Sequence, residues 1–135
     1  MFGPKQVVRL TNDPLTSSDG QTNEKDRTGV VLAETEYDDW ANSGRYNVTC
    51  LTTDFAEYES HDHTYKIDKD DHMEDGSLKS HSLVCPWATL PLPMESLTPV
   101  VDQPTREKLT LTDEGHEIVS GAVYNFLSAH NNYTR

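Results

Sequence analysis

Short apolar runs alternate with polar stretches along most of the chain, which indicates a fold built mainly from β-strands. The runs are too short for helices and are rich in valine, leucine and threonine, as strands usually are. The pattern predicts strands over residues 6–10, 29–34, 46–52, 63–67 and 82–90, and a weaker strand over 108–111. Because 29–34 and 46–52 are joined by a polar connection, we expect these two strands to pair antiparallel.

Two further stretches mark where regular pairing is expected to end. From Asn12-Asp13-Pro14 to Asp26 the chain has hardly an apolar residue, so a long exposed loop is predicted there. The strong strand that begins at Ser82 runs into Pro91-Leu92-Pro93. Since proline cannot donate a ladder hydrogen bond, pairing must stop there or the strand must lie at the edge of the sheet.

Near the C-terminus the apolar spacing changes from a strand period to a helical one. The segment Thr112-Asp113-Glu114 begins the predicted helix, and its acidic residues suit the positive end of the helix dipole. The apolar residues that follow share one face: Ile118, Val119, Ala122, Val123, Phe126 and Leu127. We therefore expect one C-terminal helix that packs on the sheet.

Many short strands followed by one helix predict a mostly β domain. The architecture that fits this order is a small barrel, or a strongly curved sheet closed by the helix. The chain has 135 residues, which suits a single domain over 1–135.

The charge changes this picture. Aspartate and glutamate number 23 against 11 lysines and arginines, so the formal net charge is −12, and the acids are spread along the chain. A hydrated acidic surface of this kind is typical of a halophile's protein, and an acidic protein from a mesophile is the alternative. The same charge repels nucleic acid, so any site for a polyanion must be local.

The cysteines and the apolar runs indicate the compartment. Cys50 and Cys85 are not spaced as a Cys-x-x-Cys pair and each lies in an apolar strand, so buried thiols are expected. The sequence shows no secretory signal, and no apolar run approaches the length that crosses a bilayer. We expect a cytoplasmic protein that does not bind a membrane.

The order of elements along the chain is the most specific feature. A polar loop ends at Arg27, the apolar strand Gly29-Val30-Val31-Leu32 follows, and the next strand ends at Thr52-Thr53. Gly76-Ser77-Leu78 and Ser80-His81-Ser82 then lead into another apolar strand. This order resembles the MazF/PemK (Kid-like) family of type II toxins, over roughly residues 3–130.

The resemblance implies a small SH3-like barrel with a packed C-terminal helix. It also implies a homodimer that cleaves single-stranded RNA without a metal ion or other cofactor, and that a small antitoxin protein holds inactive. In family members the arginine at this loop end and the threonine at this strand end are the catalytic pair, which correspond to Arg27 and Thr52. The nearby polar residues are expected to bind substrate: Lys25, Thr28, Arg45, Thr53 and Ser82.

The chemistry of these residue types agrees with that role. RNA can be cleaved when its own 2′-hydroxyl attacks the adjacent phosphorus, which builds negative charge on the phosphate oxygens. The planar guanidinium of Arg27 offers donors that match those oxygens. The Thr52 hydroxyl is too weakly acidic to act alone as a base, but it can donate a hydrogen bond that positions the phosphate.

Two other functions stay open. Thr28 follows Arg27 where the family most often has proline, and the surface is acidic. A catalytically silent barrel that binds a partner protein or nucleic acid, as relatives that inhibit DNA gyrase do, is therefore the main alternative. The histidines and acids from His61 to His72 suggest a metal site, but Met73 stands where a calcium loop requires glycine. We expect a solvated strand and turn there instead.

Overall fold

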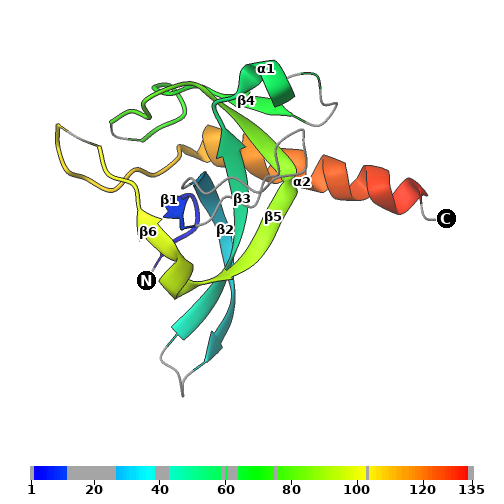
Figure 1. Cartoon of the computed structure of the whole chain (residues 1–135), viewed down its shortest axis with the longest axis horizontal. Coiled ribbons are helices and arrows are strands. Elements are labelled where there is room, and N and C mark those ends of the chain that lie inside the picture. The colour runs from blue at the N-terminus through cyan, green and yellow to red at the C-terminus, as the bar shows by residue number, and fades with distance from the viewer. Residues whose placement is uncertain are drawn as a thin grey trace.

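A computed structural model describes residues 2–11, 27–38, 43–58, 60, 64–74, 76–102 and 104–133 (Figure 1). The strands are β1 (Val7–Leu10), β2 (Arg27–Asp38), β3 (Ser43–Thr52), β4 (Tyr65–Ile67), β5 (Ser82–Pro93) and β6 (Leu97–Pro99). The helical elements are α1 (Phe55–Tyr58), the short 3₁₀ helix η1 (Met94–Ser96) and the long helix α2 (Asp113–Tyr133). Strands dominate the first hundred residues and one helix ends the chain.

The strands form one antiparallel sheet in the order β4-β5-β3-β2-β1-β6. The predicted antiparallel pairing of the second and third strands is confirmed, with Val31 opposite Val48. The prediction of a mostly β domain with a packed C-terminal helix is also confirmed. Within the described residues β4 and β6 stand at opposite ends of this order, so the strand pairing does not close the sheet on itself.

The central strands are buried on both faces, which explains why their apolar residues run consecutively instead of alternating. On the face covered by α2, called here the helix face, one cluster contains Val7, Val30, Leu51 and Val84 with Val119 and Ala122 of the helix. The opposite face holds a second cluster, which includes Val8, Val31, Val48, Cys50, Tyr58 and Cys85. Neighbouring valines in β1 and β2 therefore belong to different cores, and both cysteines are buried as predicted.

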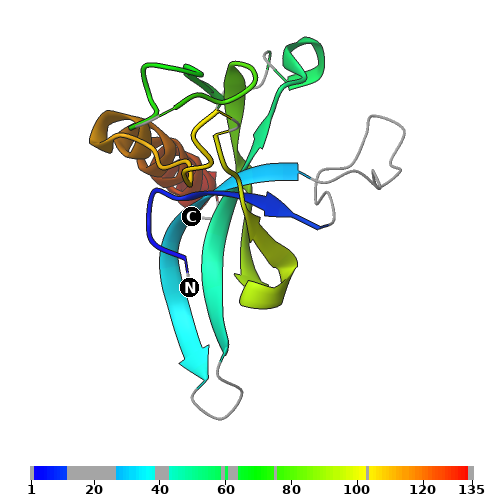
Figure 2. The same ribbon diagram turned by 90° about the vertical axis from the view of Figure 1, so that its left-hand side faces the viewer.

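The β2–β3 pair is longer than predicted and bends along its length. The strands extend to Asp38 and Ser43, residues that the sequence assigned to the polar connection. Register shifts interrupt the pairing after Val31, and such irregularities bend a strand pair. Figures 1 and 2 show the far ends of both strands extending away from α2. Near the other end the strands pack closely, since a Cβ at Gly29 would lie 2.7 Å from Val48 Cγ1.

Helix α2 begins at the predicted position because Thr112 caps it. The Thr112 Oγ1 accepts a hydrogen bond from the Gly115 amide at 3.0 Å. The first half of the helix packs on the sheet as predicted, but Leu127, expected on the buried face, is 55% exposed, and Tyr124 is 71% exposed. This end of α2 projects beyond the sheet in Figure 1, so it has no core to cover. Among the described helices, none is long and apolar enough to cross a membrane.

Several expected boundaries differ from the structure. The strand expected over 63–67 begins only at Tyr65, and the weak strand expected over 108–111 forms isolated bridges, such as Gln6 to Thr110. β5 continues through Pro91 and Pro93, which pair with β3 on one side. On the other side β4 pairs no further than Val84 in the described chain, so these prolines lie at an edge as predicted. The loop predicted before Arg27 lies outside the described residues.

The cap of α2 leads to a stability prediction. Replacing Thr112 with alanine removes the acceptor for the Gly115 amide, so the free energy of unfolding should fall by about 1 kcal/mol. Serine at the same position keeps the hydroxyl and should cost much less. Urea unfolding followed by circular dichroism measures both variants, and equal losses for alanine and serine would contradict the capping role.

Candidate functional site

Arg27 and Thr52 lie beside each other where β2 begins and β3 ends. The last paired residues at this end of the two strands are Gly29 and Cys50, so Arg27 and Thr52 each lie two residues beyond that pair. The Arg27 Nη1 donates to the Leu51 carbonyl oxygen at 3.5 Å. The Thr52 Oγ1 accepts the Asp54 amide at 3.1 Å, and the residue is only 2% exposed. The two residues predicted as a catalytic pair are therefore neighbours, and the threonine hydroxyl retains its proton for donation.

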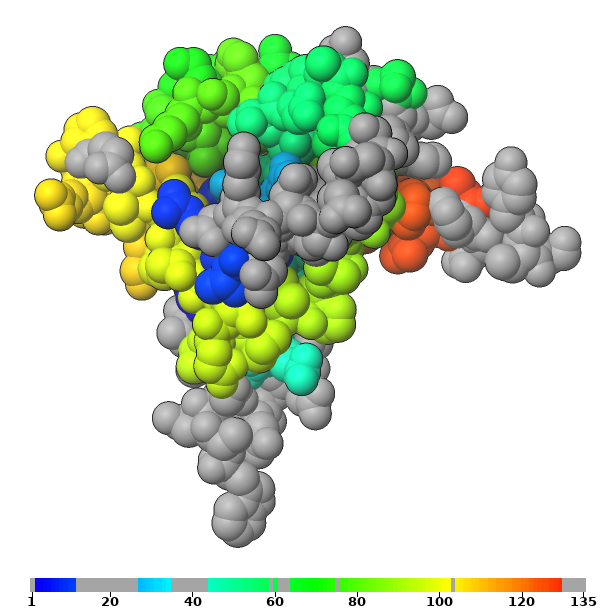
Figure 3. All heavy atoms as spheres, in the orientation of Figure 1, coloured from blue at the N-terminus to red at the C-terminus, as the bar shows by residue number. Residues whose placement is uncertain are grey.

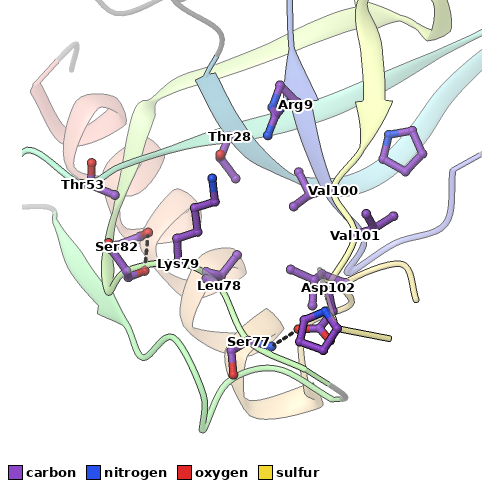
Figure 4. Close-up of a pocket in the computed structure, with 14 residues that line it drawn as sticks. Arg9, Thr28, Thr53, Ser77, Leu78, Lys79, Ser82, Val100, Val101 and Asp102 are labelled. Carbon is purple, nitrogen blue, oxygen red and sulfur yellow. Dashed lines mark hydrogen bonds between the residues drawn. The ribbon is translucent and has the colours of Figure 1, made fainter. Parts of the chain in front are cut away.

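A pocket of about 550 Å³ opens next to these strand ends (Figure 4). Its walls come from β1, β2, the end of β3, the segment 77–82 and the segment 99–109. Three of the predicted substrate-binding residues line it, namely Thr28, Thr53 and Ser82. The other polar lining residues are Arg9, Ser77, Lys79, Ser80 and Asp102. Hydroxyl and cationic groups thus converge on one cavity, a combination that suits an anionic ligand.

The pocket and the catalytic pair predicted from sequence face opposite sides of the sheet. Side chains alternate along a strand, so Thr28 and Arg27 point to different faces. Thr28 shares its face with Val30, which packs in the helix-face cluster, whereas Arg27 shares its face with Val31 in the second cluster. A ligand in the pocket therefore reaches Arg27 only around the rim where β2 begins.

Arg9 and Lys79 make this pocket locally positive. Arg9 comes from β1 and Lys79 from the segment before β5, and Figure 4 shows the Lys79 side chain extending towards Thr28. Neither residue forms an ion pair with any part of the chain that the structure describes. On a chain of net charge −12, a local cationic pocket of this kind is where a polyanion can bind.

Asp102, the acid in the described pocket lining, has its carboxylate engaged inside the wall. Its Oδ2 accepts the Thr105 hydroxyl at 2.9 Å and the Thr105 amide at 3.3 Å, and its Oδ1 accepts the Ser77 amide at 3.2 Å. The Thr105 hydroxyl and these amides hold the pKa of Asp102 below its ordinary value, although burial opposes the shift. The carboxylate thus ties two wall segments together.

Gly76 allows this junction to close. Its φ is +86°, and a Cβ there would lie 2.7 Å from Asp102 Cγ, so glycine is required by both backbone and space. The segment 76–82 and the segment around Asp102 lie side by side on the surface in Figure 3. The pocket wall is therefore built from parts of the chain that are distant in sequence.

One predicted substrate-binding residue that the structure describes, Arg45, does not line this pocket. Arg45 pairs with Glu36 and Pro93 in the far part of the sheet. Along an extended strand it stands roughly 23 Å from Thr52, at about 3.3 Å per residue. Arg45 was expected to bind substrate because it is one of the few cations near Arg27 in the sequence, but β3 carries it away from the strand end. Lys25 lies outside the described residues.

The acidic segment after β4 uses its polar atoms internally. The Asp68 Oδ1 accepts the amides of Asp71 and Asp70, each at 2.9 Å, and these bonds lower the pKa of Asp68. The His72 Nδ1 accepts the Asp68 amide at 2.8 Å. Within the described ranges, no three or more histidine, cysteine, aspartate or glutamate side chains are grouped to hold a metal ion. Residues 61–63 of the metal hypothesis lie outside those ranges.

Sequence reasoning did not identify Arg9, Lys79 or Asp102 as part of a site. The exposure of Arg9 between buried neighbours follows from strand alternation, but its neighbours across the sheet depend on pairing of β1 with β2 and β6. Lys79 lies within the stretch that suggested a family, yet nothing local indicates which cavity it borders. No pattern in the sequence predicts that Asp102 bonds to Ser77.

Asp102 gives a pH-dependent prediction. Because folding lowers its pKa, the ionised carboxylate stabilises the folded state above the ordinary pKa of about 3.9, and this contribution is lost as pH falls through the folded-state value. Asp102→Asn should therefore be less stable than wild type at pH 7, and the difference should shrink below about pH 4. Urea midpoints at pH 7 and pH 3.5 measure this change.

Glu107→Gln is the matched control for that measurement. Glu107 is exposed in the neighbouring turn, and its carboxylate makes no hydrogen bond with a described residue. The same chemical change there should leave the midpoint nearly unchanged at both pH values. A deficit of Asp102→Asn that is equally large at pH 7 and pH 3.5 would contradict the role of the ionised carboxylate.

Comparison of the sequence with protein-family models gave no match, and comparison with curated proteins gave none either. The resemblance to the MazF/PemK family therefore rests on the motif residues and their order. A function for this chain must be inferred from the strand-end pair and the pocket beside it.

Proposed function

We propose that this chain is a sequence-specific endoribonuclease toxin of the MazF/PemK type, which cleaves single-stranded RNA without a metal ion. RNA binds in the pocket between β1, β2 and the segment 77–82, and the reacting phosphate lies at the rim next to Arg27 and Thr52. The proposal includes the small SH3-like barrel of that family. An antiparallel sheet with a packed C-terminal helix is compatible with that fold at a coarse level.

The observation that carries the proposal is the meeting of Arg27 with the end of β3 beside a cationic pocket. The guanidinium is held at the strand end by the Leu51 carbonyl, so its position is restricted. Arg9 and Lys79 supply charge for the phosphates that flank the reacting one, and the hydroxyls of the pocket can bond to sugar hydroxyls. These are the groups that a short single strand of RNA requires.

The proposed reaction is a transesterification within the RNA. The 2′-hydroxyl loses its proton to solvent, its oxygen bonds to phosphorus, and the bond from phosphorus to the 5′-oxygen breaks. The products are a 2′,3′-cyclic phosphate and a 5′-hydroxyl, which takes up a proton from solvent. Arg27 stabilises the charge on the non-bridging oxygens, and the Thr52 hydroxyl donates a hydrogen bond that positions the phosphate.

A non-catalytic barrel that binds a partner protein or nucleic acid is the second candidate. Two observations favour it: Thr52 is almost completely buried, and Arg27 faces the side of the sheet opposite the pocket. In this case the pocket binds a polyanion, and the strand-end pair only supports the fold. Cleavage by purified protein distinguishes the two candidates directly.

The proposal also includes the partners expected of such a toxin, a second copy of the chain and a small antitoxin. The projecting end of α2 leaves Tyr124 and Leu127 exposed, and Tyr65 nearby is linked to that helix by a hydrogen bond from Asn125. Exposed apolar side chains that gather on one surface are typical of contact sites for proteins. An acidic surface elsewhere agrees with a cytoplasmic protein that stays soluble at high salt.

Cleavage assays test the catalytic pair. Arg27→Ala should lower the rate of cleavage of a defined single-stranded RNA by about 10²–10³-fold, the loss typical of removing one donor to a developing oxyanion. Lys66→Ala removes a cation from exposed β4, away from the pocket lining, and should cleave at the wild-type rate. The assay is run with a chelator and at both low and high salt, and the products are analysed for the cyclic phosphate.

Thr52→Ser and Thr52→Val refine that test. Serine keeps the hydroxyl and should retain most activity, whereas valine has a similar shape without the donor and should be strongly impaired. Equal activity of wild type, Arg27→Ala and Thr52→Val would exclude the catalytic assignment. RNA binding without cleavage by wild type would favour the second candidate.

The pocket cations give a separate prediction for binding. Lys79→Ala and Arg9→Ala should each weaken RNA binding, and each should reduce the slope of log affinity against log salt by about 0.7, as expected for one lost phosphate contact on a single strand. Fluorescence anisotropy with a labelled oligoribonucleotide measures both quantities. If the slope is unchanged in both variants, the RNA lies elsewhere on the protein.

A further inference from the structure

Two histidines hold the segment after β4 through consecutive backbone amides. The Asp68 amide donates to His72 Nδ1 at 2.8 Å, and the Lys69 amide donates to His81 Nδ1 at 3.1 Å. An imidazole that accepts an amide proton at one nitrogen carries its own proton on the other. Both rings are therefore neutral in this arrangement, with Nδ1 as the acceptor.

These contacts position one wall of the pocket. The carbonyl of Lys69 accepts the Leu78 amide at 3.0 Å, so the residue whose amide His81 holds also anchors the segment 77–82. Ser77, Leu78, Lys79 and Ser80 of this segment all line the pocket (Figure 4). A change at the His81 imidazole can thus be transmitted through the single residue Lys69 to the segment that carries Lys79.

Protonation is incompatible with both contacts. An N–H at Nδ1 would face an amide N–H, and two donors cannot bond to each other, so each ring must leave its amide when it gains a second proton. Imidazole is the side chain that changes charge between about pH 5 and pH 8. The wall is therefore held by bonds that require neutral imidazoles.

The charged groups that face the rings favour this release. The Asp68 Oδ2 lies 3.7 Å from His81 Nδ1, and the Glu114 Oε1 of α2 lies 4.0 Å from His72 Nε2. Asp68 keeps its charge in weak acid because the amides of Asp71 and Asp70 lower its pKa. A protonated His81 can therefore leave the Lys69 amide and bond to the Asp68 carboxylate instead. The side chain of Lys69 is the cation next to the bond that breaks.

We propose that His72 and His81 are positioning residues for the RNA pocket, which hold the Lys79 wall in place when neutral and release it when protonated. RNA binding should then weaken as pH falls, and this consequence rests on the proposed function. Simple electrostatics predicts the reverse, because acidification reduces the net negative charge of the chain and lowers its repulsion of RNA. The sign of the pH effect therefore separates the two explanations.

Hydrogen exchange tests the positioning role without RNA. Wild-type protein should lose protection over residues 68–81 between pH 7.5 and pH 5.5, after correction for the intrinsic exchange rate. In the double variant His72→Asn with His81→Asn, the asparagine Oδ1 replaces each Nδ1 as a non-titrating acceptor, so protection should persist at pH 5.5. The corresponding alanine variants lack the acceptor and should be unprotected at both pH values.

The proposal is overturned if wild-type protection is the same at both pH values, or if the asparagine variant loses as much protection as wild type. Should the double variant fail to fold, His81→Asn alone answers the question, because it leaves the Lys69 amide bonded at pH 5.5. If the Lys69 amide loses as much protection at pH 5.5 in His81→Asn as it does in wild type, the proposal is also overturned.

RNA affinity supplies the functional readout, measured in an Arg27→Ala background to prevent cleavage. Acidification from pH 7.5 to pH 5.5 should weaken binding of a single-stranded oligoribonucleotide by about tenfold, the scale set by one or two lost backbone hydrogen bonds, and should not weaken it in the asparagine variant. If affinity instead rises for wild type, the positioning proposal fails and the RNA site stands. If exchange behaves as expected but no RNA binds at pH 7.5, the proposed function fails and the histidine-held wall stands.

Discussion

The pairing of β2 with β3, buried on both faces, is the constraint on which the rest of the structure depends. One face needs a cover of its own, and α2 supplies it through Val119 and Ala122. The other face is filled by side chains such as Tyr58 and Cys85. Because each strand contributes to two cores at once, a slip of one residue would exchange the two sets of side chains. The register of these strands is therefore strongly determined.

That register also determines where the functional groups lie. Where β2 begins and β3 ends, the two cores give way to polar residues, and alternation along the strands sends Arg27 to one face and Thr28 to the other. The rim between these faces is the place at which a phosphate could contact both the pocket and the guanidinium.

Although the chain is acidic overall, cationic side chains border the pocket and the nearby carboxylate is hydrogen-bonded within its wall. Arg9 and Lys79 border the pocket without an ion-pair partner in the described chain, while the carboxylate of Asp102 accepts hydrogen bonds from the wall. Backbone and hydroxyl donors stabilise that carboxylate without a cation, which leaves the cationic side chains for a ligand. In the adjoining segment the imidazoles of His72 and His81 also accept hydrogen bonds from backbone amides.

The sequence by itself determined the class of the fold and the positions of its main elements. Consecutive valines predicted buried strands, and the antiparallel partner of 29–34 was identified. The start of the helix was predicted because a change of period and acidic residues in a first turn are local signals. The order of the strands and the family resemblance also selected Arg27 and Thr52. Both lie where β2 begins and β3 ends, and Arg27 bonds to the Leu51 carbonyl next to Thr52.

Only the tertiary structure decided which of these features share a surface. Arg27 and the pocket lie on opposite faces of the sheet, and Arg45 lies far from the pocket. The hydrogen bonds of Asp102 and His81 connect segments that are separated along the chain. The exposed Leu127 shows the same limit, since its helical spacing is that of a buried residue but the sheet ends before reaching it. Local patterns report the periodicity of burial along one element, whereas contacts between elements depend on where long-range packing brings them.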